Sequence, residues 1–161
     1  PHLILWYGKK NINIQSKFWK KLKNKVDSSY DIPMNAITEK YSKYCKDITK
    51  DYFKNGNIYG QGVYVIQLKK LINEIENLRG KWGYFYEYTI NDLNKISKFI
   101  NKKFQTVSYY GFDKKFFKNF LKTNFIDGVD RIVPLGSGLN IDLLWDGYDI
   151  IRTLSKAKYI E

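Results

Sequence analysis

Few side chains in this sequence are of the types that perform covalent or metal chemistry. The chain has one cysteine, Cys45, and one histidine, His2. Zinc centres need several cysteines or histidines together, so the composition excludes a cysteine-rich zinc site, and we expect no metal cofactor. Lys43 and Lys46 flank Cys45, but no histidine stands near it in sequence to act as a base. Its position beside Tyr44 on an apolar helix side favours a buried structural thiol.

Backbone N–H groups could form a second kind of site, one that binds an anion. Gly136-Ser137-Gly138 is a short segment whose N–H groups are suited to bind an anion. A single Gly-x-Gly is a weak signal, however, because the same residues occur in many loop turns. We therefore expect a turn here rather than an anion site.

The charge balance is the most unusual feature of the composition. There are 28 lysines and arginines against 16 aspartates and glutamates, a net charge of +12, and 17% of the residues are aromatic. Cations and aromatic rings together are typical of nucleic-acid binding. However, the chain has few arginines (Arg79, Arg131 and Arg152), and its lysines are spread along its whole length. Because arginine dominates base contacts and bidentate phosphate contacts, the pattern indicates a general lysine bias and argues against a nucleic-acid interface.

The elements that must position any site alternate between strands and helices. The apolar run Leu3–Tyr7 predicts a buried strand, and the alternation over Trp82–Ile90 predicts a strand with two distinct faces. Apolar residues at helical spacing, with lysines opposite them, predict helices. The expected strands are residues 3–7, 62–68, 82–90, 105–110 and 129–134. The expected helices are residues 17–26, 33–52, 93–100 and 114–121.

Several residues at the ends of these helices have capping preferences. Ser16 and Asp113 are expected N-caps, since their side chains accept hydrogen bonds from the first turn. Pro33 is tolerated in the first turn of the second helix. Asn55-Gly56-Asn57 is expected to end that helix, because glycine and asparagine favour helix termination.

The alternation predicts an α/β fold with a largely parallel sheet flanked by helices. The 161 residues contain no internal repeat and no linker, which favours a single domain. No apolar run approaches the ~18 residues that a membrane helix needs. No leader pattern precedes the first strand, and the single cysteine gives no disulfide framework, so we expect a cytoplasmic location without a membrane span.

Two segments near the carboxyl end resemble a known family. The run Gly128-Val129-Asp130-Arg131-Ile132-Val133-Pro134-Leu135-Gly136, followed by Trp145-Asp146-Gly147-Tyr148-Asp149, resembles the end of LuxC-type long-chain acyl-CoA reductases. These enzymes belong to the aldehyde dehydrogenase superfamily. Residues 104–111 are similar to the stretch before that ending, and residues 1–6 with Phe18-Trp19 resemble the segment after the catalytic cysteine. The resemblance runs through the chain in order and is weakest over about residues 30–80.

The resemblance implies reduction of a long-chain fatty acyl-CoA to a fatty aldehyde with NADPH, the reaction that supplies bacterial bioluminescence. In the family a cysteine thiolate attacks the thioester carbonyl, CoA leaves, and the enzyme thioester accepts a hydride. If Pro1 is the proline of the family's Cys-Ser-Ser-Pro-like turn, the nucleophile immediately precedes this chain. Residues 1–161 are then a partial domain, the carboxyl-terminal portion of the catalytic domain. The cofactor-binding domain would lie outside the chain, and the chain alone would be inactive.

The resemblance also implies which residues lie near the substrate. His2 would stand close to the nucleophile, and Trp145, Asp146 and Tyr148 would lie in the segment that lines the substrate tunnel. Structural alternatives stay open for each of them. His2 would then pack at the start of a strand, Trp145 and Tyr148 would anchor a core, and Asp146 would be a cap or turn residue.

Glu87 is the candidate for a contact with the cofactor. The superfamily places a glutamate that binds the cofactor ribose near this strand, but Arg79-Gly80-Lys81 stands where that glutamate would be expected. The alternative for Glu87 is an exposed position on the strand.

The implied partners are an acyl-CoA substrate, a second copy of the chain and an acyl-protein synthetase. Residues 155–161 resemble the superfamily's carboxyl-terminal tail, which often joins a partner subunit, so a homo-oligomer is expected. The alternative function is a basic, non-catalytic α/β module that binds nucleic acid.

Overall fold

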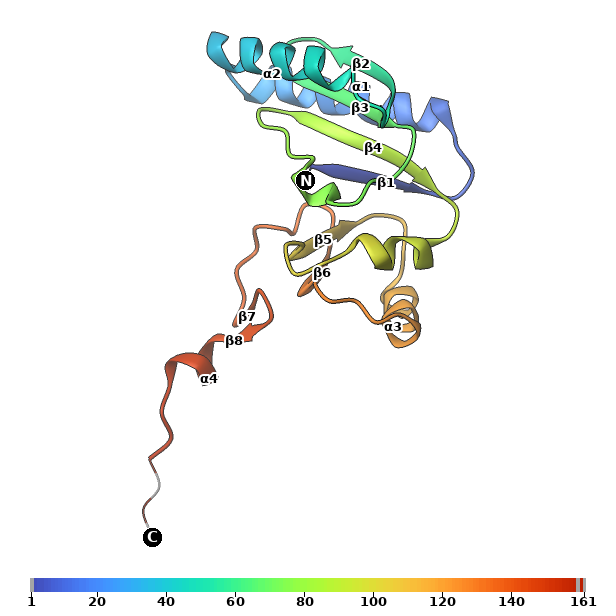
Figure 1. Ribbon diagram of the computed structural model, residues 1–161. Coiled ribbons are helices and arrows are strands. Elements are labelled where there is room, and N and C mark those ends of the chain that lie inside the picture. The colour runs from blue at the N-terminus through green and yellow to red at the C-terminus, as the bar shows by residue number, and fades with distance from the viewer. Residues whose placement is uncertain (1, 159, 161) are drawn as a thin grey trace. The chain divides into compact units, whose positions relative to one another are not determined.

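The computed structural model describes residues 2–158 and residue 160. The chain forms two compact units, Pro1–Leu93 and Asn94–Glu161. The first contains a four-stranded sheet, and the second contains two smaller sheets of two strands each (Figure 1).

The sheet of the first unit has the strand order β1-β4-β3-β2. Its strands are β1 (Leu3–Tyr7), β2 (Phe53–Tyr59), β3 (Val63–Leu68) and β4 (Tyr84–Ile90). β1, β4 and β3 are parallel, with Leu5 opposite Tyr88 and Ile66 opposite Tyr86, and β2 is antiparallel to β3. The strands expected over residues 3–7, 62–68 and 82–90 are therefore confirmed, with small changes at their ends.

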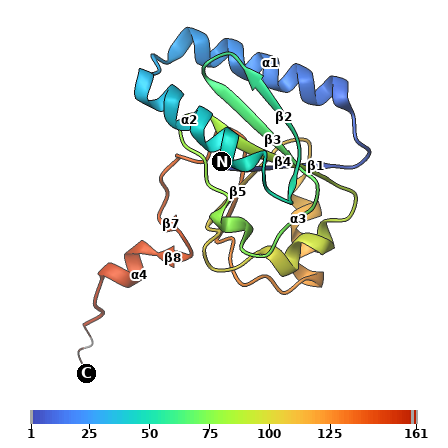
Figure 2. The same cartoon turned by 45° about the horizontal axis from the view of Figure 1, so that its top comes forward.

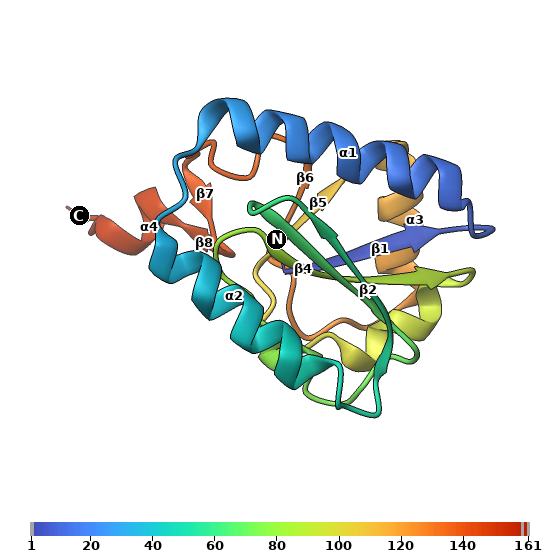
Figure 3. The ribbon, with the colours of Figure 1, turned by 90° about the horizontal axis from the view of Figure 1, so that it is seen from above.

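Two helices cover opposite faces of this sheet, as Figure 2 and Figure 3 show. They are α1 (Ile12–Ser29) and α2 (Met34–Asp47). Successive side chains of a strand point to opposite faces, so the alternation of β4 meets a different helix on each side. Phe85 and Glu87 contact Trp19 of α1, whereas Tyr84 and Tyr86 bond to Asp47 of α2.

The core between α1 and the sheet is aromatic and aliphatic. Trp19, Val63 and Val65 are buried at its centre. Phe18, Leu22 and Val26, which the sequence places on one side of a helix, pack against them together with Trp6. The helical periodicity thus predicted the buried face of α1 correctly.

Two helix boundaries differ from prediction. α1 begins five residues before the expected position, because Asn11 and not Ser16 is its N-cap and accepts a hydrogen bond from the Ile14 amide at 3.1 Å. α2 ends at Asp47 rather than at residue 52.

The segment Asn55-Gly56-Asn57 does not end a helix. It lies inside β2, which the sequence analysis missed. A Cβ atom on Gly56 would lie 2.5 Å from the ring of Tyr44, so the glycine allows α2 to pack closely on this strand. Glycine therefore serves close packing here, although in sequence it indicated a break.

The second unit contains a short β-α-β arrangement. Its elements are the 3-10 helix η2 (Leu93–Phe99, which begins at the end of the first unit), β5 (Thr106–Tyr109), α3 (Lys114–Thr123) and β6 (Arg131–Pro134). β5 and β6 are parallel, with Val107 opposite Ile132. Asp113 caps α3 as predicted, accepting from the Phe116 amide at 2.7 Å. The helix expected over residues 93–100 is present as a 3-10 helix.

The carboxyl-terminal part of this unit is a hairpin followed by a short helix. The strands are β7 (Leu144–Trp145) and β8 (Tyr148–Asp149), and the helix is α4 (Ile150–Leu154). Asp149 caps α4 by accepting from the Arg152 amide at 3.1 Å. This hairpin was not predicted, because each of its strands has only two residues.

The chain is thus an α/β protein with a largely parallel main sheet flanked by helices, as the alternation of elements predicted. A further helix, η1 (Ile75–Asn77), is a single 3-10 turn in a segment that the sequence left open. Within the described residues, no helix combines the length and the apolar character needed to cross a membrane.

Candidate functional site

The five predicted site residues divide between the two units. His2 and Glu87 belong to the first unit, whereas Trp145, Asp146 and Tyr148 belong to the second. Within each unit the structure shows what these residues contact.

Glu87 is a buried carboxylate, with 3% of its surface exposed. Its Oε2 atom accepts hydrogen bonds from the indole N–H groups of Trp6 and Trp19, both at 2.8 Å. Its Oε1 atom accepts from Gln67 at 3.4 Å. The expected alternative of an exposed strand residue is wrong, because the inward face of β4 carries this side chain under α1. Both oxygens already have donors, so the geometry gives Glu87 a structural role, and its contact with a cofactor stays a prediction.

His2 stands just before β1. Its carbonyl oxygen accepts from the amide of Tyr86 in the neighbouring parallel strand, at 2.8 Å. Partial burial, together with the positive charge of Arg79, lowers the pKa of His2 below its ordinary value. A lowered pKa favours the neutral imidazole, the form that can accept a proton.

The two segments that carry the family resemblance contact each other within the second unit. The guanidinium of Arg131 lies 4.3 Å from the ring centroid of Trp145, at cation–π distance. The same group donates to the carbonyls of Gly138 and Asn140 at 3.3 and 3.0 Å. Arg131 thus joins β6, the loop that follows it and β7. Sequence reasoning did not identify this residue as a site component.

Asp146 and Gly147 form the turn of the β7–β8 hairpin. Both have positive φ, 48° and 81°, as a two-residue hairpin turn of the Asp-Gly type requires. A Cβ atom on Gly147 would lie 3.0 Å from the carboxylate of Asp130, so the turn packs closely on the segment before β6. The turn interpretation of Asp146 therefore agrees with the structure.

Trp145 and Tyr148 lie opposite each other across this hairpin. Trp145 is half-buried beneath Arg131, whereas Tyr148 is 67% exposed. Tyr148 is therefore not a core anchor, and its ring is available to a ligand or a partner.

Cys45 is exposed on α2, so the expectation of a buried structural thiol is wrong. The side of α2 that packs on the sheet carries Lys40, Tyr44 and Asp47, and Cys45 lies off that side. Ser137 donates its amide hydrogen to the Pro134 carbonyl at 3.0 Å, as expected for a turn. Within the residues that the structure describes, no group of three or more acidic, histidine or cysteine side chains is placed to hold a metal ion.

A second buried carboxylate was not predicted. Asp47, at 3% exposure, accepts hydrogen bonds from three tyrosine hydroxyls on the α2 side of the sheet. The donors are Tyr84 at 2.7 Å, Tyr86 at 2.6 Å and Tyr52 at 2.9 Å. The Lys43 ammonium lies 3.6 Å from the same carboxylate. Burial and bonding to the Asp47 carboxylate raise the pKa of all three tyrosines well above the ordinary value.

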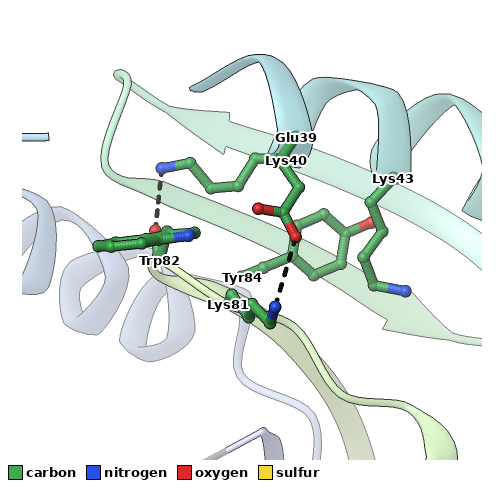
Figure 4. Close-up of a pocket in the computed structure, with 6 residues that line it drawn as sticks. All are labelled: Glu39, Lys40, Lys43, Lys81, Trp82 and Tyr84. Atoms are coloured by element: carbon green, nitrogen blue, oxygen red, sulfur yellow. Dashed lines mark hydrogen bonds and ion pairs between the residues drawn. The ribbon is translucent and has the colours of Figure 1, made fainter. Parts of the chain in front are cut away.

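The same face of the sheet carries a hollow at the amino end of β4, which Figure 4 shows. Three lysines, a glutamate and two aromatic residues line it: Glu39, Lys40, Lys43, Lys81, Trp82 and Tyr84. No motif in the sequence indicated this hollow, because its residues come from α2, from the loop before β4 and from the start of β4.

Comparison with known proteins does not assign the chain to a family. No protein-family model matches the chain, and no curated protein matches it.

Proposed function

We propose that this chain is the carboxyl-terminal part of the catalytic domain of a LuxC-type long-chain acyl-CoA reductase. The observation that carries the proposal is the pair of segments Gly128–Gly136 and Trp145–Asp149, which resemble the family's ending. Arg131 from the first segment covers Trp145 from the second, and Asp130 lies against Gly147. These contacts support the proposal, because they give a reason for the two motifs to occur together.

In this proposal the chain reduces a fatty acyl thioester as part of a longer polypeptide. The nucleophilic cysteine would immediately precede Pro1, and a cofactor domain outside these residues would bind NADPH, which supplies the hydride. His2 would stand beside the nucleophile at the amino end of β1, where a neutral imidazole can accept the thiol proton. Glu87, held by two indoles, fits a nucleotide ribose poorly, so we assign no step to it.

The β7–β8 hairpin would contribute to the binding of the aliphatic chain. Tyr148 offers an exposed ring, and the preceding loop together with the start of β7 exposes apolar side chains, namely Leu135, Leu139, Ile141, Leu143 and Leu144. A surface of this kind suits a long alkyl group, whose transfer from water is favourable by about 0.8 kcal/mol per buried methylene. The proposed enzyme is cytoplasmic and forms a homo-oligomer, with an acyl-protein synthetase as a further partner.

Two measurements test this function. The coding sequence upstream of Pro1 should encode a Cys-Ser-Ser-Pro-like turn, and any other sequence there would reject the proposal. The longer polypeptide should oxidise NADPH when a long-chain acyl-CoA is added, whereas residues 1–161 alone should not. Oxidation of NADPH by the isolated chain would equally contradict the proposal.

The second candidate function is nucleic-acid binding, and one observation favours it. Lys17, Lys20, Lys21 and Lys25 are exposed along the outer side of α1. A phosphate-binding surface would lose affinity for an oligonucleotide steeply as salt increases, with a slope set by the number of phosphates contacted. Binding that is weak and absent at physiological salt would reject this candidate.

A further inference from the structure

The outer side of α1 carries a positive charge that the fold leaves unbalanced. Residues 9–26 contain seven lysines and no aspartate or glutamate. Four of these lysines are exposed on the side of the helix that faces away from the sheet, namely Lys17, Lys20, Lys21 and Lys25. Lys23 pairs with Asp27, but among the described residues no carboxylate is paired with any of the other four. Although lysines are spread through the sequence, the helix gathers these four into one stripe.

This charge continues onto the edge of the sheet at which α1 begins. β1, β3 and β4 are parallel, so their carboxyl ends lie at the same edge. α1 follows β1 after the short loop of residues 8–11, and Figure 3 shows its amino end on the side to which β1 points. Lys9 and Lys10 in this loop and Lys69 after β3 are exposed, and Lys10 donates to Gln67 of β3 at 3.2 Å.

The first turn of α1 also exposes two isoleucines. Ile12 is 66% exposed and Ile14 is 58% exposed. Neither belongs to the core beneath the helix, to which α1 contributes Phe18, Trp19, Leu22 and Val26. The helix does not need them in order to begin, because Asn11 provides the cap. The folding of α1 therefore does not explain why apolar side chains occupy these two positions.

The lysines and the isoleucines together indicate the kind of partner. Lysines attract any polyanion, but a nucleic acid would also require exposed aromatic rings on which its bases stack. The aromatic side chains of α1, Phe18 and Trp19, pack against the core instead. Isoleucine side chains gain free energy when they enter the boundary between lipid headgroups and acyl chains, and lysines beside them are attracted to anionic headgroups. An anionic bilayer surface fits both features, whereas a nucleic acid fits only the charge.

We propose that the outer side and the first turn of α1 bind the surface of an anionic phospholipid bilayer. Ile12 and Ile14 enter the headgroup boundary, and the four exposed lysines of the stripe lie against the lipid phosphates. The apolar side of α1 stays on the sheet, so the helix lies on the bilayer and does not cross it. This surface goes beyond the proposed reductase function and does not depend on it.

The test is a flotation assay of the 161-residue chain with lipid vesicles. Vesicles of equal parts phosphatidylglycerol and phosphatidylcholine are compared with vesicles of phosphatidylcholine alone. We expect binding to the anionic vesicles that falls steeply as salt is raised, and no binding to the neutral vesicles. Equal binding to both kinds of vesicle, or binding to neither, would overturn the proposal.

Ile12→Gln and Ile14→Gln test the apolar contact. Both side chains are exposed, so the variants should keep the circular dichroism spectrum of the unaltered chain. Each should bind anionic vesicles about tenfold more weakly, because its side chain no longer gains free energy by leaving water. The matched control is Met34→Gln, since Met34 is 74% exposed in the first turn of α2, the helix on the opposite face of the sheet. Its binding should be unchanged.

Lys17→Gln and Lys21→Gln test the contact with the headgroups. Each should weaken binding to anionic vesicles about fivefold. Lys81→Gln removes the same charge from a side chain that is 77% exposed in the loop before β4, at the other edge of the sheet, and should have no effect.

A single-stranded oligonucleotide separates the bilayer from the other polyanion. Loss of vesicle binding in the isoleucine variants, with oligonucleotide binding weak or absent, would support the bilayer surface. If the lysine variants lose affinity for the oligonucleotide while the isoleucine variants bind vesicles as the unaltered chain does, the stripe is a nucleic-acid site and the proposal is overturned.

Discussion

Asp47 shows how one charged residue organises a face of the sheet. Its carboxylate is buried and is bonded by hydroxyls from Tyr84 and Tyr86 on β4 and from Tyr52 after α2. A buried charge is tolerated only when hydrogen bonds replace its hydration. The three donors therefore fix where α2 ends on the sheet, because its last residue must reach these hydroxyls.

Replacement of Asp47 with asparagine tests this role. The amide keeps the size of the side chain but accepts fewer hydrogen bonds and carries no charge. Since each hydrogen bond to a charged group contributes about 1.5–3 kcal/mol, we expect the free energy of unfolding to fall by roughly 3 kcal/mol. Denaturant unfolding followed by circular dichroism measures it. The matched control is Asp51→Asn, whose exposed ion pair with Lys70 should leave stability unchanged. Equal effects of the two variants would contradict the role given to Asp47.

The raised pKa values of the three tyrosines that bond to Asp47 predict that the folded chain loses stability at alkaline pH. Their pKa values are raised in the folded chain, so the folded state keeps protons that the unfolded state loses above pH ~10. Their contribution is complete below that pH and is lost as the pH rises further. In a titration followed by ultraviolet absorbance, three of the 14 tyrosines should ionise only together with unfolding. Ionisation of all 14 before the structure is lost would show that the cluster does not form.

Arg131 makes a comparable connection in the second unit. Replacement with methionine removes the stacking on Trp145 and the two hydrogen bonds to the loop carbonyls. If about 2 kcal/mol of local stability is lost, residues 135–143 open about 30-fold more often. Limited proteolysis with a protease specific for apolar side chains should show faster cleavage in this loop.

The control for this variant is Arg152→Met. Arg152 is an exposed residue of α4 that pairs with Asp149 at 3.7 Å, so its loss should leave cleavage of the loop unchanged. Cleavage of the Arg131 variant at the rate of the unaltered chain would mean that other contacts hold the loop.

At the scale of elements, periodic patterns predicted most of the fold. The apolar run before Gly8, the alternation of β4 and the apolar stripe of α1 each correspond to an observed element. The errors arose where tertiary packing decided the structure. Gly56 lies in a strand because Tyr44 packs against it, and α2 ends at Asp47 because that residue bonds across to the sheet.

The candidate site was less predictable than the fold. Asp146 was recognised as a possible cap or turn residue, and the structure places it in a hairpin turn. Glu87 was not recognised as buried, because its partners Trp6 and Trp19 lie far from it in sequence. The contact of Arg131 with Trp145 and the lysine-lined hollow were missed for the same reason, since neither follows from spacing along the chain.

The start of β6 depends on one glycine. Gly128 has a φ of 146°, and a Cβ atom there would lie 2.2 Å from the carbonyl oxygen of Asn101. Gly128→Ala should destabilise the β5–β6 sheet by more than ~1–2 kcal/mol, the ordinary cost of a left-handed alanine, because a backbone collision is added. Hydrogen exchange of the β5 and β6 amides measures this.

Gly111→Ala is the matched control for that variant. Gly111 also has a positive φ, 80°, but nothing lies within 4 Å of the added methyl group. The smaller effect of this change isolates the collision at Gly128. Equal protection losses in the two variants would show that the close approach to Asn101 does not exist in solution.

At the scale of the whole molecule, the net charge and the sequence motifs favour different functions. The net charge of +12 suggests polyanions, but its lysines are dispersed, and the hollow in the first unit gathers only three of them. The motif segments of the second unit are the basis of the proposal that the chain is part of an acyl-CoA reductase. An anionic CoA thioester is a substrate that is compatible with both features, because a positive surface attracts it and an apolar loop suits its acyl chain.

Covalent acylation tests the reductase proposal most directly. The proposal requires a polypeptide that extends upstream of Pro1, and this polypeptide should be incubated with a long-chain acyl-CoA without NADPH and its intact mass measured. We predict the addition of one acyl group, located by peptide mapping on a cysteine immediately before Pro1 and released as aldehyde when NADPH is added. An unchanged mass, or an acyl group attached at Cys45 instead, would contradict the proposal.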